Sequence, residues 1–326
     1  MARVRFAPSP TGSLHIGNAL SAAANRRVGA WMLLRIDDTD PARNLPGGEA
    51  AILRDLEWLG IEWDEGPVRQ SERGERYREA AELLGGRFDG ITLVRGDGTA
   101  TYHLASVVDD VDFGITHLVR GNDHRPNEAL HRRLFEALGA PPPEFVHHGL
   151  VLGPDGKKLS KRAEGATVAS LRDAGIPGEA VRAYLDELGL PRHDVRLDLA
   201  RIRRLSTEAI ERMSDDELAA RADVPASAVP VMRGARDLRE AREFAEVVLA
   251  APDPAPVAAP ETLVRFRELA QNGLDAKGIV RELKAVGGDL RALRRALTGR
   301  ERGPELAAVI AALPRDEALR RVDAAL

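Results

Sequence analysis

The sequence RVRFAPSPTG at residues 3–12, followed by LHIGN at residues 14–18, decides the fold class of this chain. Residues 3–7 are typical of a strand, whereas Pro8 and Pro10 exclude helix in the segment that follows. Helix resumes at about Ile16. A strand, a loop and a helix in this order begin a βα unit, so they predict a parallel sheet covered by helices.

The rest of the first half extends this pattern of short apolar runs and amphipathic stretches. A second strand at residues 31–36 ends in an acidic turn at 37–41, and a helix over residues 52–59 is closed by Gly60. The turn Gly96-Asp97-Gly98 predicts a hairpin of residues 91–95 and 99–103. The remaining elements that we expect there are helices at about 104–112 and 126–138, and strands at 116–120 and 145–152.

Every segment beyond the basic loop at 153–162 is predicted to be helical. Ser214 and Glu217 have the spacing of a capping box, and the four prolines between residues 251 and 260 indicate a linker or a sharp corner.

Composition limits the class of protein. The chain has 326 residues, too many for one ordinary core, and no cysteine, which excludes disulfides, a thiolate nucleophile and cysteine-bound zinc. It has neither a signal-peptide pattern nor about 18 consecutive apolar residues, so we expect a cytoplasmic protein without membrane contact. A net charge of −4 requires any nucleic-acid contact to rest on a local basic patch.

Two separated motifs indicate nucleotide chemistry. Gly17 has no side chain, so adenine could stack on its backbone, while His15 and the start of the following helix face an anionic phosphate chain. Lys158, Lys161 and Arg162 place three cations within five residues, which suits the charge that develops on a triphosphate. Separately, each motif is also compatible with an ordinary loop or a solvated basic turn. Together, after the first and the last strand, they are improbable by chance.

At this point the chain resembles the class I aminoacyl-tRNA synthetases of the glutamyl and glutaminyl subgroup. The resemblance covers most of residues 1–221 and is carried, in order, by RFAPSPTG at 5–12, HIGN at 15–18, RIDDTD at 35–40, TYHLA at 101–105, VDD at 108–110 and KLSKR at 158–162. Residues 293–326 resemble, more weakly, the closing helices of the glutamyl enzymes.

The resemblance implies an α/β fold with three domains. These are a Rossmann-like catalytic domain at 1–165, a helical connecting domain at 166–223 and a helical C-terminal domain at 224–326 similar to a shortened anticodon-binding region. It also implies that an amino-acid carboxylate attacks the α-phosphate of ATP, with Mg²⁺ accompanying the nucleotide and no zinc. The matching catalytic residues are His15, Lys158 and Lys161. The matching ATP-binding residues are His15, Gly17, Asp123, Leu150, Val151, Lys158, Ser160 and Lys161.

The amino acid is expected to be glutamate or a close analogue. Arg5 and Arg120 end separate strands, where ligands of parallel sheets bind, and each guanidinium could form a fork with a carboxylate. Alternatively, the two arginines form structural ion pairs with Asp37, Asp38 or Asp110. The residues that match the family's amino-acid site are Arg5, Ala7, Ser9, Asp37, Tyr102, Ser106 and Arg120.

Two departures from the family pattern bear on substrate and partner. Asp37, Ser106 and Asp123 replace residues that are usually Glu, Asn and Glu, so the pocket is expected to differ in shape. Only Gly85 to Gly90 remains where family members insert a domain that grips the tRNA acceptor end, and six residues cannot hold a domain.

These observations leave several functions open. The leading one is adenylation of glutamate followed by transfer to tRNA, by a protein that we expect to be a monomer. The missing insertion weakens the expectation for tRNA, so a paralogue that transfers to a small amine or a carrier protein is the alternative. A silent binding protein and a tRNA-modifying glutamyl-queuosine enzyme are further candidates. Arg291, Arg294 and Arg295 could track phosphates from one helix, or form a solvated face.

Overall fold

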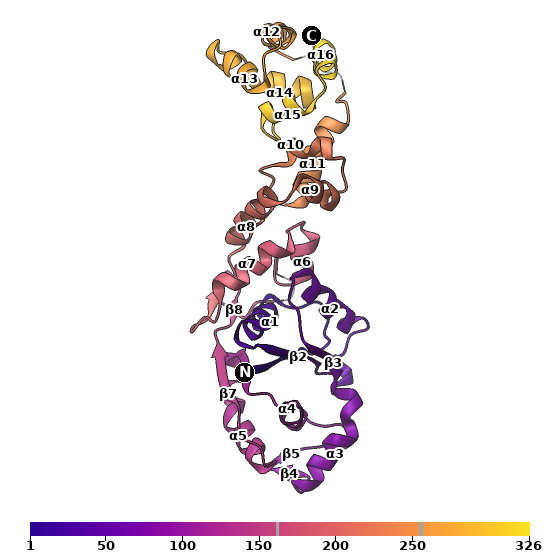
Figure 1. The fold of residues 1–326 in the computed structure, drawn as a ribbon, viewed down its shortest axis with the longest axis vertical. Helices are drawn as coiled ribbons and strands as arrows, with labels where there is room; N and C mark the ends of the chain where they lie inside the picture. The colour runs from indigo at the N-terminus through magenta and orange to yellow at the C-terminus, as the bar shows by residue number, and fades with distance from the viewer. Residues whose placement is uncertain (161–162, 254–256) are drawn as a thin grey trace. The chain divides into compact units, whose positions relative to one another are not determined.

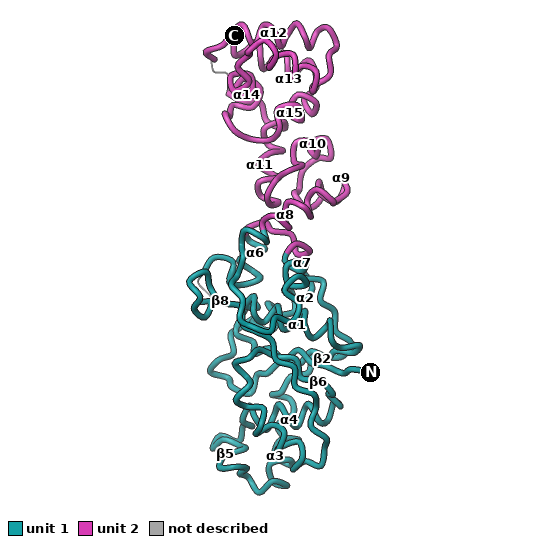
Figure 2. The backbone as a smooth tube through the Cα atoms, turned by 90° about the vertical axis from the view of Figure 1, so that its left-hand side faces the viewer, with its two compact units in different colours: residues 1–173, 181–202 teal, residues 174–180, 203–326 magenta. Residues whose placement is uncertain are grey.

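The computed structural model describes residues 1–160, 163–253 and 257–326, which form two compact units (Figure 2). Unit 1 comprises residues 1–173 and 181–202, and unit 2 comprises residues 174–180 and 203–326. The division into three domains with boundaries at 165 and 223 stays a prediction.

A parallel sheet organises unit 1. Strands β1 (Arg3–Phe6), β2 (Trp31–Ile36) and β3 (Glu65–Arg69) are hydrogen-bonded in that order, and β6 (His117–Gly121) pairs with β7 (Glu144–His148). The Thr116 N–H, just before β6, donates to the Arg3 oxygen at 2.9 Å, which places β6 beside β1. The spatial order is therefore β7, β6, β1, β2, β3. The order in which successive strands are added reverses between β1 and β6, as in doubly wound folds.

Helices cover both sides of this sheet (Figure 1). On one side lie α1 (Ile16–Val28) and α2 (Gly48–Trp58), and on the other lies α4 (Tyr102–Asp112), flanked by α3 (Gly74–Leu83) and α5 (Glu128–Ala137). The core on the second side joins Leu33 of β2 to Leu104 of α4 and Phe135 of α5, all fully buried or nearly so. The predicted α/β class is confirmed.

Three local predictions need correction. The hairpin at 91–103 is shorter than predicted: the Arg95 N–H donates to the Thr99 oxygen at 2.8 Å and Val94 bridges Ala100, but Tyr102 already begins the buried helix α4. The strand at 145–152 is broken into β7 and β8 (Val151–Leu152), since the chain at Gly149 passes so close to His193 that a Cβ would lie 1.9 Å from its carbonyl oxygen.

The segment beyond the basic loop is not wholly helical either. Strand β9 (Val195–Arg196) pairs in parallel with β8, and β3 was not predicted at all.

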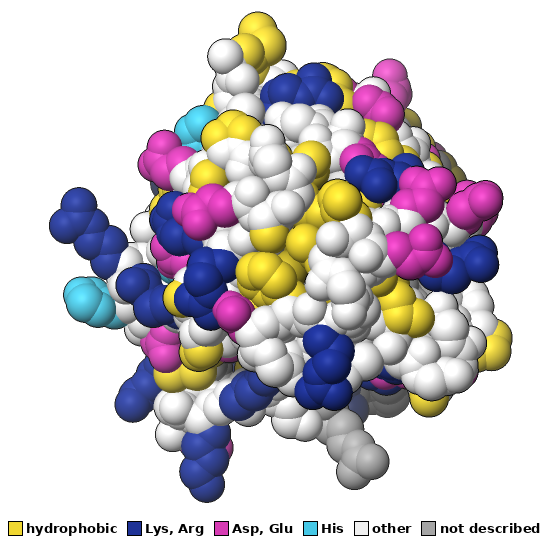
Figure 3. All heavy atoms as spheres, turned by 90° about the horizontal axis from the view of Figure 1, so that it is seen from below, with side chains coloured by type: hydrophobic (Ala, Val, Ile, Leu, Met, Phe, Trp, Pro, Cys, Tyr) yellow, Lys and Arg dark blue, Asp and Glu magenta, His cyan; other side chains and the backbone are white. Residues whose placement is uncertain are grey.

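The predicted six-residue connection is a small hairpin. Strands β4 (Arg87–Phe88) and β5 (Ile91–Thr92) pair antiparallel directly after α3, and Asp89 with a φ of 49° and Gly90 with a φ of 79° make the turn. Figure 3 views unit 1 from this end: both acidic and basic side chains lie around an apolar centre. This face is therefore mixed in charge rather than a basic field.

Two more helices, α6 (Val168–Asp173) and α7 (Gly178–Leu188), follow the basic loop, and α8 (Leu199–Arg212) leads into unit 2. In its described residues, unit 2 is helical around one apolar core that includes Leu218, Phe266 and Leu293. Its helices are α9 (Asp215–Ala222), α10 (Val229–Met232), α11 (Leu238–Leu249), α12 (Pro260–Gln271), α13 (Ala276–Ala285), α14 (Leu290–Thr298), α15 (Leu306–Ala312) and α16 (Arg315–Asp323).

The structure tests two predictions made for unit 2, a capping box and a row of arginines on one helix. The Ser214 hydroxyl accepts from the Glu217 N–H at 3.2 Å, as the capping box predicted. Arg291, Arg294 and Arg295 do share α14, but Arg294 turns inward and donates to the Pro304 oxygen, and burial lowers its pKa. The three arginines therefore do not form one exposed stripe. Across the described residues, no helix has the length and apolarity needed to span a bilayer.

Candidate active site

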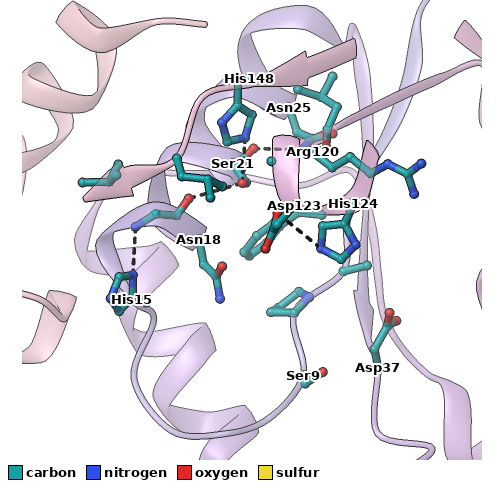
Figure 4. A pocket seen from close by; sticks show the side chains of 18 of the residues that line it. Ser9, His15, Asn18, Ser21, Asn25, Asp37, Arg120, Asp123, His124 and His148 are labelled. Carbon is teal, nitrogen blue, oxygen red and sulfur yellow. Dashed lines mark hydrogen bonds and ion pairs between the residues drawn. The ribbon is translucent and has the colours of Figure 1, made fainter. Parts of the chain in front are cut away.

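A cavity of about 560 Å³ opens where β1 and β6 end, next to the first turn of α1 (Figure 4). The carboxyl ends of two parallel strands diverge at this point, which is where open α/β sheets bind their ligands. The cavity brings together most of the predicted site residues, namely Arg5, Ala7, Ser9, His15, Gly17, Asp37, Tyr102, Ser106, Arg120, Asp123, Leu150, Val151 and Lys158. Ser160 is not among its lining residues, and Lys161 lies outside the described residues.

The proline-rich loop before α1 is anchored by a buried carboxylate. Asp55 of α2 accepts from the Ser13 hydroxyl at 2.6 Å and from the Leu14 N–H at 2.7 Å. Its other oxygen accepts from Arg172 of α6 at 2.9 Å. These bonds hold the loop that leads directly into His15.

His15 connects the start of α1 to the basic loop. Its Nδ1 accepts from the Gly17 N–H at 3.3 Å, and its Nε2 lies 3.0 Å from the Leu159 carbonyl oxygen. Because a carbonyl oxygen only accepts, Nε2 carries the proton and the ring has a defined tautomer. The two motifs that the sequence separates by more than a hundred residues therefore meet at one side chain.

The basic loop is held against the cavity at its base. Leu152 and Lys158 form an antiparallel bridge, and the Gly153 N–H donates to the Lys157 oxygen at 2.8 Å. Lys158 lines the cavity, on the same loop as Leu159, whose oxygen faces His15. A primary ammonium at this position can approach an anion bound near the start of α1.

A polar stripe along α1 forms another wall and was missed by the sequence reasoning. Asn18, Ser21 and Asn25 all line the cavity, at a helical spacing of three and four residues (Figure 4). Ser21 Oγ contacts His148 Nε2 at 2.9 Å, and the Asn25 amide donates to the Val119 oxygen of β6 at 3.1 Å. The available signal was three polar residues on one face of an otherwise alanine-rich helix.

At the end of β1 and β2, carboxylates surround two arginines. Arg35, fully buried, lies 2.7 Å from Asp37 and 3.0 Å from Asp110, and these carboxylates raise its pKa well above the usual value although burial opposes them. Arg5 Nε donates to the same Asp110 at 3.2 Å. For Arg5, the structural ion pair considered in the sequence analysis is thus present, through one of its nitrogens.

Asp37 contacts Arg35 and also lines the cavity. Its side chain is 11% exposed, and burial raises its pKa, opposed chiefly by Arg35. Asp37 directly follows β2 and lines the cavity, so it is placed to accept from a ligand ammonium.

Arg120 differs from Arg5 and Arg35. Its side chain is buried, and within residues 1–160, 163–253 and 257–326 no carboxylate pairs with it. Its Nη2 atom is buried and without a hydrogen-bond partner. Burial, with the nearby charge of Arg5, lowers its pKa. For Arg120, a structural ion pair is therefore absent from the described residues, and an unpaired buried guanidinium requires an anion.

Tyr102 and His124 complete this end. The Tyr102 hydroxyl lies 3.2 Å from His124 Nδ1, and burial raises the pKa of Tyr102 while it lowers that of His124. Both side chains are therefore neutral and able to donate or accept one hydrogen bond. His124 was not predicted, because nothing local in the sequence distinguishes it from a surface histidine.

With this geometry established, the comparisons with known proteins identify the class. The chain matches the family described as "tRNA synthetases class I (E and Q), catalytic domain" over residues 1–87 and 85–221. The chain belongs to this family, as its motifs suggested. The two matched segments meet at the point where the short β4–β5 hairpin lies.

The individual proteins that the chain resembles are named more specifically than the family. "Glutamate--tRNA ligase 1" of Rubrobacter xylanophilus is 41% identical over 63% of this chain, and "Glutamate--tRNA ligase" of Akkermansia muciniphila is 31% identical over 99% of it. The first match spans only 58% of that relative's length, and a second, from Ruegeria, spans 61%. The Akkermansia alignment runs over 428 positions, more than this chain has, so that relative contains segments missing here.

Solved structures agree on the fold. A glutamate tRNA ligase from Elizabethkingia meningosepticum, crystallised in complex with its amino acid, has a TM-score of 0.79 and 24% identity over 99% of both chains. A glutamate-tRNA synthetase from Elizabethkingia anophelis has a TM-score of 0.77 and 23% identity.

Proposed function

We propose that this protein activates glutamate, or a close analogue, with ATP to an aminoacyl adenylate and transfers the acyl group to tRNA. The observation that carries the proposal is the buried, unpaired Arg120 at one end of a cavity whose other end holds the His15–Leu159 junction (Figure 4).

Charge balance supports an acidic amino acid. Near the ends of β1 and β2, Arg35 is matched by Asp37 and Arg5 by Asp110, whereas Arg120 has no carboxylate partner among the described residues. Glutamate at neutral pH has two carboxylates and one ammonium, and therefore a net charge of −1. Its binding would compensate the charge of Arg120 without burying an excess charge there.

Adenylation then needs little covalent help from the protein. One carboxylate oxygen of the amino acid attacks the α-phosphorus of ATP, the new C–O–P linkage forms, and the bond to the bridging oxygen breaks so that pyrophosphate leaves. Positioning and charge stabilisation account for the rate of such reactions. The start of α1 and the ammonium of Lys158 are placed to bind the phosphates, while the Nε2–H of His15, donated to the Leu159 oxygen, holds the basic loop at this end of the cavity. Mg²⁺ would arrive with ATP as part of the substrate.

The acceptor is supported by the relatives rather than by the geometry. The curated relatives described above are all named as glutamate–tRNA ligases, which favours tRNA, and nothing supports an amine or a carrier protein. Asp37, Ser106 and Asp123 all line the cavity, so their shorter side chains are placed to alter amino-acid preference.

The test is ATP–pyrophosphate exchange across a panel of amino acids, with and without total tRNA, together with acid-precipitable labelled glutamate. We expect exchange that depends on an acidic amino acid and on tRNA, and formation of glutamyl-tRNA. Exchange indifferent to tRNA would favour another acceptor, and strict preference for an apolar amino acid would refute the role given to Arg120.

A further inference from the structure

Arg120 is held by imidazoles, whereas Arg35 is held by carboxylates. Its Nε donates to His147 Nε2 at 3.4 Å, and its Nη1 lies 3.5 Å from His131 Nδ1. Both histidine side chains are almost completely buried. Two neutral rings thus occupy the positions where an ion pair would be expected.

Hydrogen-bond roles fix the protons of both rings. Guanidinium nitrogens only donate, so His147 Nε2 and His131 Nδ1 must accept, and each neutral ring keeps its proton on the other nitrogen. The His131 Nε2–H then donates to His103 Nδ1 at 3.0 Å. The His147 Nδ1–H faces the Glu128 carboxylate at 3.5 Å. Two short chains of polar contacts, one through His131 and one through His147, therefore end on Arg120.

This choice of partner has an electrostatic consequence. A carboxylate beside Arg120 would orient the guanidinium but also cancel its charge, as Asp37 and Asp110 do for Arg35. An imidazole orients it equally and leaves the charge intact. Burial and Arg120 together lower the pKa of His131 to about 3, so this ring stays neutral in the working range.

We infer that His131 and His147 are positioning residues for substrate specificity: they hold the Arg120 guanidinium at the cavity wall as an uncompensated cation that selects a carboxylate-bearing side chain over its amide. This inference rests on the proposed function, because it presumes an acidic amino acid at Arg120.

A matched pair of substitutions separates orientation from charge. In His131→Asn the amide oxygen replaces Nδ1 as a neutral acceptor, whereas His131→Asp has the same shape but adds a negative charge. We expect the Asn variant to retain glutamate affinity within about threefold, and the Asp variant to lose about tenfold or more. Affinity for ATP, which binds at the other end of the cavity, should be the same in both.

The measurement is calorimetric titration of each protein with L-glutamate, L-glutamine and ATP, with thermal unfolding to verify the fold. A preference for glutamate over glutamine that falls in the Asp variant alone supports the inference. Equal glutamate affinity in the Asn and Asp variants would overturn it. If wild-type protein binds no glutamate, the proposed function fails instead.

If His131→Asp does not fold, a second pair at His147 provides the test. His147→Gln keeps an acceptor at the place of Nε2, and His147→Met removes it at similar size. Loss of glutamate affinity in the Met variant and its retention in the Gln variant would support positioning, while equal affinity in both would contradict it.

Discussion

At the scale of single residues, the arginines at and near the cavity differ in whether a carboxylate neutralises their charge. Arg35 and Arg5 contact carboxylates, whereas Arg120 contacts only neutral groups among the described residues. The sequence predicted Arg5 and Arg120 because both end parallel strands. It could not predict His131 or His147, since their role depends on contacts between α5, β6 and β7 that no local pattern encodes.

Replacing Arg120 by Met should weaken the amino-acid site selectively. The loss of a charged hydrogen bond of about 2–3 kcal/mol corresponds to a roughly 30- to 150-fold weaker affinity for glutamate. Arg120→Lys, which keeps the charge without the fork, should recover part of it. Calorimetry with glutamate measures this, and unchanged glutamate binding in the Met variant would show that the acidic substrate binds elsewhere.

Lys158 should act on the reaction rather than on amino-acid binding. Lys158→Met removes a cation from the phosphate end, so adenylation turnover should fall roughly 100-fold, while the KM for glutamate changes little. Lys157→Met is the matched control, because Lys157 does not line the cavity. Pyrophosphate exchange kinetics provide the test; an equal effect of both variants would remove the role from Lys158.

At the scale of elements, strands with continuous apolar runs were predictable and those made by distant pairing were not. β2 was predicted to the residue because WMLLRI is a nearly continuous apolar run, and the structure buries it almost throughout. β3, with the sequence EGPVR, has one large apolar residue and is more exposed, so it gave no such signal. β8 and β9 exist only because segments more than forty residues apart pair with each other.

Asp55 shows how one element positions another. It is fully buried on α2 and holds the loop before α1 through Ser13 and Leu14. Asp55→Ala would leave a buried N–H without an acceptor and Arg172 without its partner, so we expect unfolding to become easier by about 3 kcal/mol. Glu57→Ala, on an exposed face of the same helix, should stay within about 0.5 kcal/mol of wild type. Urea unfolding compares them, and equal stability of the two variants would contradict this anchoring role.

At the scale of the whole molecule, the buried histidines make stability depend on pH. His131 has a pKa lowered to about 3, mainly by burial, against an ordinary value near 6.5 in the unfolded chain. The unfolded state therefore binds more protons between these values, and stability is complete above about pH 6.5 and falls as the pH decreases toward 3.

For His131 alone the loss at pH 5 amounts to about 2 kcal/mol. We expect the unfolding free energy to fall between pH 7 and pH 5, and to fall less in His131→Asn, which has no group to titrate there. Urea denaturation at a series of pH values measures both slopes. An identical slope in the variant would mean that His131 is not neutral in the folded protein.

The family and the fold follow from short motifs in unit 1, while unit 2 contributes helices whose role the sequence indicated only weakly. The central claim is that one cavity holds both substrates, with the amino acid at Arg120 and the ATP phosphates at His15 and Lys158. A crystal structure with glutamate and a non-hydrolysable ATP analogue tests this most directly. We predict a glutamate carboxylate within hydrogen-bonding distance of the Arg120 guanidinium, and phosphates at the start of α1. Density for the two ligands on separate surfaces, or glutamate bound away from Arg120, would contradict the account.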